Sequence, residues 1–243
     1  MHEAAIRLDG VSAGYGTATV LDNMSLSIAK GETVAVLGRN GVGKTTLLST
    51  LMGRTRVSQG EISLKGEPVS RWPIWRRARG GLALVPQERE IFPSLTVEQN
   101  LTVARRGTRW PLARVYDLFG RLRERSGNLG NRLSGGEQQM LAVARALMGS
   151  PDVLMLDEPL EGLAPVIVDA LMDAMRELRD AGGMTLLLVE QHARLALEFA
   201  PRAIVLVRGK IAYDGPSQGL LEDDERLHTL IGVASEGRSV ATA

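Results

Sequence analysis

A glycine-rich loop with a lysine and two threonines is the first stretch that could do chemistry. GRNGVGKTT, residues 38–46, follows the apolar run TVAVL and leads into a helix-like segment. Glycines would let backbone N–H groups approach phosphate oxygens, which a helix N-terminus also attracts. Lys44 would reach the β- and γ-phosphates and Thr45 would ligate magnesium. The stretch therefore predicts a nucleotide site whose phosphate-binding residues are Gly38, Asn40, Gly41, Gly43, Lys44, Thr45 and Thr46.

Two adjacent carboxylates end a second apolar run. VLMLDE, residues 153–158, is typical of a buried strand that ends in Asp157 and Glu158. Such a strand can place Asp157 on magnesium and leave Glu158 to polarise a water molecule. Apolar strands ending in Asp-Glu are common, so the pair is informative mainly because a glycine-lysine-threonine loop precedes it. The two stretches together predict the two halves of one nucleotide site.

A second candidate phosphate-binding turn lies at LSGGEQQMLAVARAL, residues 133–147. Ser-Gly-Gly before a helix presents free backbone N–H groups to an anion. A serine that only caps the helix would explain why the helix starts there. Helix capping alone would not explain why one chain has two such turns. A second turn has a use if Ser134, Gly135 and Gly136 complete the phosphate site of a neighbouring subunit.

These residues need a sheet and helices to position them. Helix-like segments at 136–150 and 164–183 separate short apolar runs, an alternation that predicts an α/β fold with a mostly parallel sheet. Residues 4–32 alternate in polarity between Gly- and Asn-containing breaks, which is typical of antiparallel strands. The apolar runs, expected to be strands buried on both faces, are 33–38, 82–86, 153–158, 184–190 and 203–209.

Composition limits the class of protein. The chain has 243 residues, 44% of them hydrophobic, which is enough to fill a real core. It has no cysteine, which excludes disulfides and thiolate chemistry. Its apolar runs are far shorter than the roughly 18 residues of a membrane span, and MHEAAIRLDG does not resemble a secretory signal. We expect a globular protein.

The near-neutral net charge hides an uneven distribution. Residues 71–145 carry 14 basic residues, all arginine, against 6 acidic ones, whereas residues 146–243 carry 8 basic against 16 acidic. Arginines cluster in SRWPIWRRARGG and ARRGTRW. Such a run is usually a solvated helical face; the functional alternative is a surface near anionic lipid or an acidic partner. Nucleic acid is disfavoured because no groove-reading motif accompanies the local basic excess.

The combined motifs resemble an ATP-binding cassette (ABC) ATPase, and the resemblance covers nearly the whole chain. It implies ATP and magnesium as cofactors, a P-loop NTPase core with a mostly parallel sheet, an N-terminal antiparallel β subdomain and an inserted α-helical subdomain at about 88–145. We expect a single domain over residues 1–243 whose tail, 234–243, is disordered. The segment LSGGE would be the family signature, which closes on the γ-phosphate held by a second cassette.

The resemblance also implies three further roles. Tyr15 would stack on adenine, although it could be an ordinary turn tyrosine. Gln87 would report on the γ-phosphate and magnesium while its loop contacts the membrane subunit. Glu158 would position the attacking water, and Lys44 would stabilise the phosphoryl group.

The stretch VEQHARLALEF, residues 189–199, departs from the family pattern. The family has a switch histidine two positions after the last apolar residue of this strand, where this chain has Gln191. A glutamine amide can donate a hydrogen bond to phosphate but cannot become a cation. If the strand ends one residue early, His192 takes the role instead. Glu190 is expected to be a surface carboxylate, and Ala164 stands where many cassettes have an aspartate that couples the two sites.

Several segments favour one branch of the family. VEQ, EGLAP, SGGEQQMLA and VPQEREIFPSLTVEQNL resemble the second ATP-binding subunit of importers for branched-chain amino acids and of related importers for urea and short amides; GRNGVGKTTLL and QEREIF lean towards the latter. The resemblance implies a second cassette, two permeases and a solute-binding protein as partners, and a place on the cytoplasmic face of the cell membrane. The alternatives are an exporter or lipid transporter and a non-transport cassette; a plain kinase would have no use for LSGGEQQ.

Overall fold

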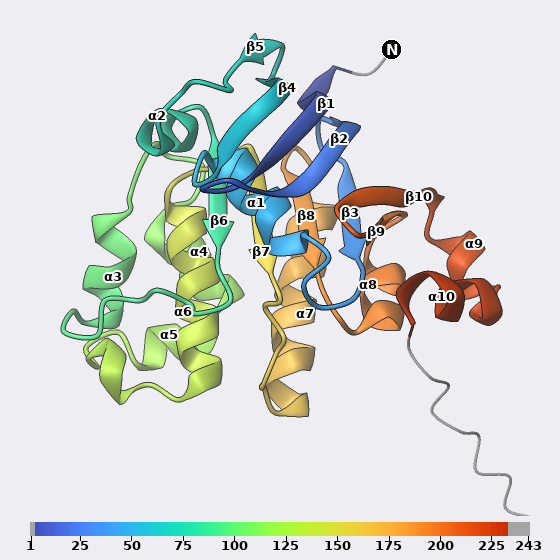
Figure 1. The fold of residues 1–243 in the computed structure, drawn as a ribbon. Helices are drawn as coiled ribbons and strands as arrows, with labels where there is room; N and C mark the ends of the chain where they lie inside the picture. Colours follow the sequence, from blue (N-terminus) through green and yellow to red (C-terminus); the bar gives the residue numbers. More distant parts are fainter. Residues whose placement is uncertain (1–2, 233–243) are drawn as a thin grey trace, which may run out of the picture.

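A six-stranded sheet forms the centre of the computed structural model, which describes residues 3–232 (Figure 1). In the sheet order given below, the first strand runs antiparallel to the second, and the last five strands all pair in parallel. Every residue of β3, β7 and β8 is buried, as the continuous apolar runs predict. The order is β10 (Lys210–Pro216), β9 (Arg202–Val207), β3 (Thr33–Leu37), β8 (Thr185–Val189), β7 (Val153–Asp157) and β6 (Leu82–Val85).

A second, antiparallel sheet covers one side of the first (Figure 1). Its order is β2 (Ala18–Ala29), β1 (Ala4–Tyr15), β4 (Arg56–Leu64) and β5 (Glu67–Pro68). The first two strands are the predicted ones. We did not predict β4, because most of RVSQGEISL is polar and only Ile62 and Leu64 at its end are buried. Pairing with β1, which is distant in sequence, makes this segment a strand.

Most helices lie in the connections between the parallel strands. Helices α3 to α6 lie between β6 and β7, where the helical insertion at about 88–145 was predicted, and α6 continues to Met148. The predicted disordered tail, 234–243, lies outside the described residues. The helices are α1 (Lys44–Met52), α2 (Ile74–Arg79), α3 (Val97–Val103), α4 (Leu112–Leu118), α5 (Gly120–Glu124), the 3-10 helix η1 (Gly130–Arg132), α6 (Gly135–Met148), α7 (Pro165–Asp180), α8 (Ala193–Phe199), α9 (Gln218–Leu221) and α10 (Asp224–Ile231).

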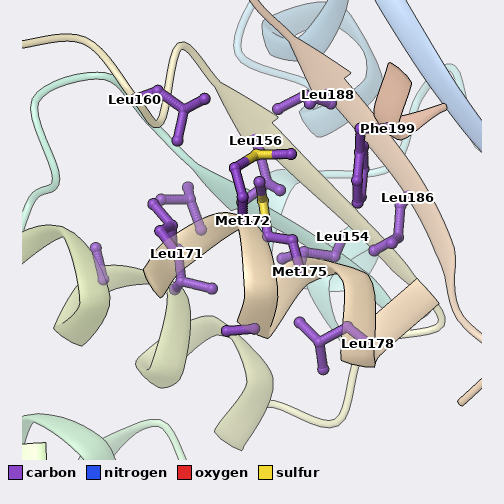
Figure 2. Close-up of a cluster of buried hydrophobic side chains, with 14 of the residues drawn as sticks. Leu154, Leu156, Leu160, Leu171, Met172, Met175, Leu178, Leu186, Leu188 and Phe199 are labelled. Atoms are coloured by element: carbon purple, nitrogen blue, oxygen red, sulfur yellow. The ribbon is translucent and has the colours of Figure 1, made fainter. Parts of the chain in front are cut away.

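Alternate side chains of the parallel strands build two separate cores. Val34, Val36 and Met155 join the core under α1 and the antiparallel sheet. Leu154 and Leu156 point to the opposite face, where α7 packs (Figure 2). The buried side chains of α7 recur at intervals of three or four residues, as a helix with one apolar face requires: Leu171, Met172, Ala174, Met175 and Leu178. Because both faces are covered, the strand ends are fixed relative to one another.

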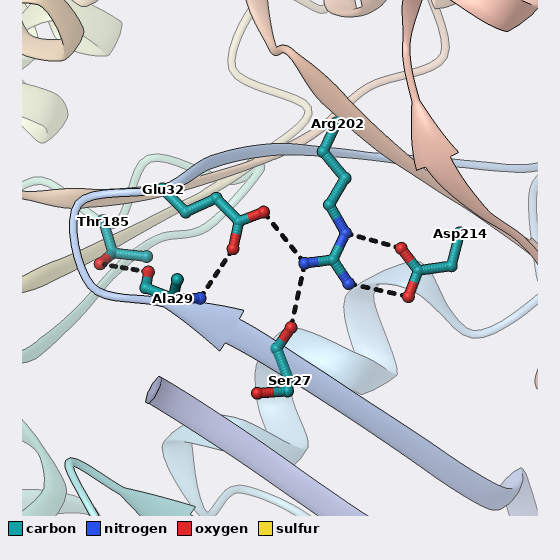
Figure 3. A network of polar contacts seen from close by, with 6 residues as sticks. All are labelled: Ser27, Ala29, Glu32, Thr185, Arg202 and Asp214. Carbon is teal, nitrogen blue, oxygen red and sulfur yellow. Dashed lines mark hydrogen bonds and ion pairs between the residues drawn. The ribbon is translucent and has the colours of Figure 1, made fainter. Parts of the chain in front are cut away.

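Arg202, at the start of β9, joins the two sheets (Figure 3). Its guanidinium donates to both carboxylate oxygens of Asp214, at 2.6 and 2.8 Å, and to Glu32 Oε1 at 3.0 Å. It also donates to the carbonyl of Ser27 in β2 at 3.0 Å. The Asp214 carboxylate is the main cause of a raised Arg202 pKa, so the arginine stays charged and the network, which includes bidentate pairing, stays intact.

One arginine of the basic segment is not on a solvated face. Arg77 is 1% exposed, and burial lowers its pKa. The solvated-face interpretation of SRWPIWRRARGG is therefore wrong at this position, because the fold places carbonyl acceptors around it. Among residues 3–232, no helix is long and apolar enough to cross a membrane.

Candidate active site

The loop between β3 and α1 can form only because it is rich in glycine. Gly38, Gly41 and Gly43 have φ angles of 145°, 78° and 110°, a region that other residues rarely adopt. A Cβ on Gly38 would lie 2.5 Å from the carbonyl oxygen of Leu206 in β9. The loop therefore curves tightly and brings its backbone to the N-terminus of α1, which is the arrangement that binds phosphate.

Lys44, the first residue of α1, points back into this loop. Its side chain is 4% exposed, and its ammonium donates to the carbonyl oxygens of Gly38 at 2.8 Å and Arg39 at 3.2 Å. The same Nζ atom lies 3.4 Å from Glu158 Oε1. The lysine thus links the glycine loop to the end of β7.

The two carboxylates after β7 have different surroundings. Asp157 accepts a hydrogen bond from Thr45 Oγ1 at 3.2 Å. Burial, with the nearby charges of Glu158 and Glu88, raises the pKa of Asp157 to about 6, against the lowering effects of Thr45 and Lys44. Glu158 has a left-handed φ of 47°, a strained conformation for a non-glycine residue. This turn directs its carboxylate towards Lys44 and Gln191.

A cavity of about 280 Å³ collects most of the predicted site residues. Gln87 reaches it from the end of β6 and donates a hydrogen bond to Glu161, a residue that no sequence motif indicates. The adjacent parallel strands explain the convergence, because their carboxyl ends meet at one edge. The lining residues are Asn40, Gly41, Gly43, Lys44, Thr45, Thr46, Gln87, Glu158, Glu161 and Gln191.

The oxygen donors beside this cavity fit magnesium. The Thr45 hydroxyl, the Asp157 carboxylate and the Gln87 amide are the hard ligands that this ion prefers. In the part of the chain that the structure describes, no group of three or more His, Cys, Asp and Glu residues could hold a metal. A magnesium ion here would therefore depend on phosphate oxygens and water for its remaining ligands, as is usual at nucleotide sites.

The structure does not bring the signature turn into this cavity. Ser134 caps α6: its hydroxyl accepts from Glu137 N at 3.3 Å, and Glu137 Oε2 accepts from Ser134 N at 2.8 Å. Gly135 follows at the start of the helix, and a Cβ on Gly136 would lie 2.6 Å from Ile167 on α7. The turn is thus a well-formed helix N-terminus outside the residues that line the cavity.

Tyr15 also lies outside the cavity lining. It is the last residue of β1, pairs with Ala18 and is 49% exposed. An exposed ring at a strand end is free to stack on a planar ligand.

The strand β8 ends at Val189, which decides the register of the residues that follow. Gln191 lines the cavity, and its amide donates a hydrogen bond to Glu158 Oε2. His192 is the N-cap residue of α8 and makes no side-chain capping bond there. The strand therefore does not end one residue earlier, and Gln191 is the residue beside Glu158. Which of Gln191 and His192 contacts a phosphate stays a prediction.

Glu190 is not the surface carboxylate that we predicted. It is 1% exposed, and it accepts hydrogen bonds from Leu160 N at 3.0 Å and Gln191 N at 3.2 Å. Burial raises its pKa to about 6. Glu158 N donates to Val189 O at 2.9 Å, so the loops after β7 and β8 run side by side and enclose Glu190. Only the pairing of these two strands could have revealed this.

Asp157→Asn is expected to stabilise the protein at neutral pH when nucleotide and magnesium are absent. Burial raises the folded-state pKa of Asp157 from 3.8 to about 6, so the ionised carboxylate destabilises the fold. This destabilisation is negligible below about pH 4, where the carboxyl is protonated, and complete above about pH 7. Asparagine cannot ionise and can still accept from Thr45. The free energy of unfolding at pH 7 should rise by up to about 3 kcal/mol. Urea unfolding at pH 4 and pH 7 checks this; an equal difference at both values would contradict it.

Comparison with known proteins identifies the family. Residues 21–161 match the sequence model described as ABC transporter. The chain belongs to the ABC transporter family. It is 40% identical over 232 residues to the branched-chain amino acid transport ATP-binding protein BraG of Pseudomonas aeruginosa, covering 93% of this chain and 99% of BraG. It is 36% identical to a probable branched-chain amino acid transport ATP-binding protein, LivF, of Archaeoglobus fulgidus, with 94% and 99% covered.

Solved structures agree with the predicted fold. The ATP-binding subunit of an ABC transporter superposes with a TM-score of 0.78 at 26% identity, covering 95% of each chain. A dimeric ATP-binding cassette bound to ADP and Pi superposes with a TM-score of 0.76 at 24% identity, covering 87% of this chain and 98% of the other. The predicted α/β cassette fold and the predicted ABC family are confirmed, and the chain is an ATPase of this family.

Proposed function

We propose that this ABC ATPase is the ATP-hydrolysing subunit of an importer for branched-chain amino acids or for urea and short amides. The observation that carries this proposal is the similarity to BraG along nearly the whole length of both chains. Both BraG and LivF are named for branched-chain amino acids, which favours that solute class over urea and amides.

The contacts around the cavity support a role for the main site residues. Lys44 and the N–H groups of the glycine loop would hold the phosphates, and Thr45, Asp157 and Gln87 would hold magnesium. When bound, magnesium would neutralise charge on the phosphate oxygens. Phosphates would also draw the Lys44 ammonium away from Glu158, which would leave this carboxylate to orient the attacking water and accept its proton.

The site would be completed by a second cassette. We propose that the Ser134 hydroxyl and the N–H groups of Gly135 and Gly136 donate to the γ-phosphate held by that partner, which explains why they lie outside the cavity of their own chain. The dimeric state of a related cassette supports this arrangement. Tyr15 would stack on the adenine of this chain's own nucleotide. Preorganised donors of this kind stabilise the charge of the transferring phosphoryl group.

The proposed assembly has two cassettes, this chain and a second one that we expect to be a different chain. They would act on two permease subunits at the cytoplasmic face of the cell membrane, supplied by a solute-binding protein. The second candidate function is an export cassette, because a lipopolysaccharide export ATP-binding protein, LptB of Haemophilus influenzae, is 32% identical over 92% of this chain. Its lower identity is the reason to rank import first.

Gln191→Ala is expected to lower turnover by about 100-fold, because it removes a donor to the developing phosphate charge. His192→Ala should change turnover less than about twofold, since this side chain makes no capping bond and does not line the cavity. ATPase assays of the two variants at saturating ATP check this pair. Reduced turnover in His192→Ala together with unchanged turnover in Gln191→Ala would assign the phosphate contact to His192 instead.

The function is tested by reconstituting the chain in liposomes with the second cassette, the permeases and the binding protein of the proposed assembly. Leucine, urea and acetamide are then screened for stimulation of ATP hydrolysis. Stimulation by leucine alone is expected. Stimulation by urea or acetamide would assign the other importer branch, and intact basal hydrolysis without stimulation by any solute would refute import of these classes and favour the export cassette.

A further inference from the structure

The short helix α2 lies on the outside of the molecule (Figure 1), and exposed basic and aromatic side chains surround it. We call it the α2 surface and define it by its exposed residues. Trp75 is 59% exposed and Ile74 is 44% exposed. No acidic residue occurs between Arg71 and Gly80. The exposed members are Arg71, Ile74, Trp75, Arg76 and Arg79.

No acidic side chain within residues 3–232 neutralises the positive charge of this surface. The Arg76 guanidinium lies over the ring of Trp72, 4.1 Å from its centroid, and that of Arg79 lies 5.3 Å from the centroid of Trp75. Within residues 3–232, Arg71, Arg76 and Arg79 form no ion pair with an acidic side chain. These cations therefore remain available to an external anion.

Some other arginines of residues 71–145 are paired with acidic side chains. Arg121 contacts Glu124 at 3.0 Å, and Arg123 contacts Asp117 at 2.5 Å. A solvated charged face normally carries such mixed pairs. The α2 surface differs from it both in charge balance and in its exposed indole.

A buried arginine holds this surface in a fixed orientation. Arg77 donates to the carbonyl oxygens of Thr50 at 2.7 Å, Leu51 at 2.8 Å and Ser70 at 2.9 Å. A Cβ on Gly53 would lie 2.9 Å from Arg77 Nε, so the absence of a side chain there makes room for the guanidinium. The helix is anchored to the end of α1, and Trp75 is kept outward instead of folding onto the core.

We propose that the α2 surface binds the anionic headgroup layer of a lipid bilayer. Trp75 and Ile74 would enter the headgroup region, where indole rings are favoured. Arg71, Arg76 and Arg79 would contact the lipid phosphates, to which clustered cations are attracted. A projecting indole flanked by unpaired arginines suits a soft anionic surface better than an acidic protein surface. The proposal does not depend on import or on the solute.

Sedimentation of the purified full-length chain with large vesicles tests this proposal. The vesicles contain either phosphatidylglycerol and phosphatidylcholine in equal parts or phosphatidylcholine alone. We expect binding to the anionic vesicles that weakens as salt is added. The double variant Arg71→Ala with Arg79→Ala should lower the partition coefficient by about 30-fold, and Trp75→Ala by about tenfold.

The matched control is Arg121→Ala with Arg123→Ala, which removes the same charge from the same basic segment and should leave partitioning unchanged. Circular dichroism establishes that each variant folds. Equal binding to both vesicle types, or equal loss in the control, would overturn the proposal. Binding that requires the reconstituted permeases and is absent with anionic vesicles would overturn it in favour of an acidic protein partner.

Discussion

Glu158→Gln is expected to lower ATP turnover by at least about 100-fold while ATP affinity stays within about threefold of the unmodified protein. Removing a general base typically has an effect of this size. The phosphate contacts come from the glycine loop and Lys44, which the substitution leaves in place. The Glu158 carboxylate now lies 3.4 Å from Lys44 Nζ and accepts from Gln191. A glutamine amide fits the same space but cannot take a proton from water.

Single-turnover hydrolysis and equilibrium ATP binding, both measured in the assembled transporter, separate these two effects. Glu88→Gln is the matched control: it removes one exposed negative charge that acts on Asp157 and should keep turnover within about twofold. Hydrolysis by Glu158→Gln at the unmodified rate would contradict the role given to this residue. A similar loss in both variants would indicate a general charge effect instead.

Glu190→Ala is expected to reduce the free energy of unfolding by about 2–4 kcal/mol at pH 4, where the raised pKa keeps the buried carboxyl neutral and its removal relieves no buried charge. Its carboxylate is the acceptor for the buried Leu160 N–H and the partly buried Gln191 N–H. An orphaned buried N–H costs about 1–3 kcal/mol, and the second lost bond adds about 1 kcal/mol. Turnover should also fall, because the loop after Glu158 and the residue Gln191 lose the group that joins them.

Glu190→Gln should have an intermediate effect, because its single amide oxygen can accept only one of the two N–H groups while its NH₂ faces the other. Glu198→Ala, at an exposed position on α8, is the control and should change stability by less than about 0.5 kcal/mol. Urea unfolding and ATPase assays of all three variants provide the measurements. An alanine variant as stable as the control would show that water replaces the carboxylate.

The site residues that local patterns predict are those whose function is local. Lys44 and Thr45 belong to one turn between a strand and a helix, and their spacing alone predicts a phosphate site. Asp157 and Glu158 end an apolar strand. For the same reason the strand–helix alternation predicts the α/β fold and the parallel sheet, since continuous apolar runs form strands buried on both faces.

Other features arise from segments that meet only after folding. The sequence predicts Glu190 to be a surface carboxylate, but the pairing of β7 with β8 encloses it beside Leu160. The sequence predicts Arg77 to belong to a solvated charged run, but it is buried and donates to carbonyl oxygens of α1. The sequence determines which chemistry is available, because spacing within a motif is local. Burial, hydrogen-bond partners and the separation of Ser134 from Lys44 were decided by tertiary packing, because they depend on neighbours distant in the chain.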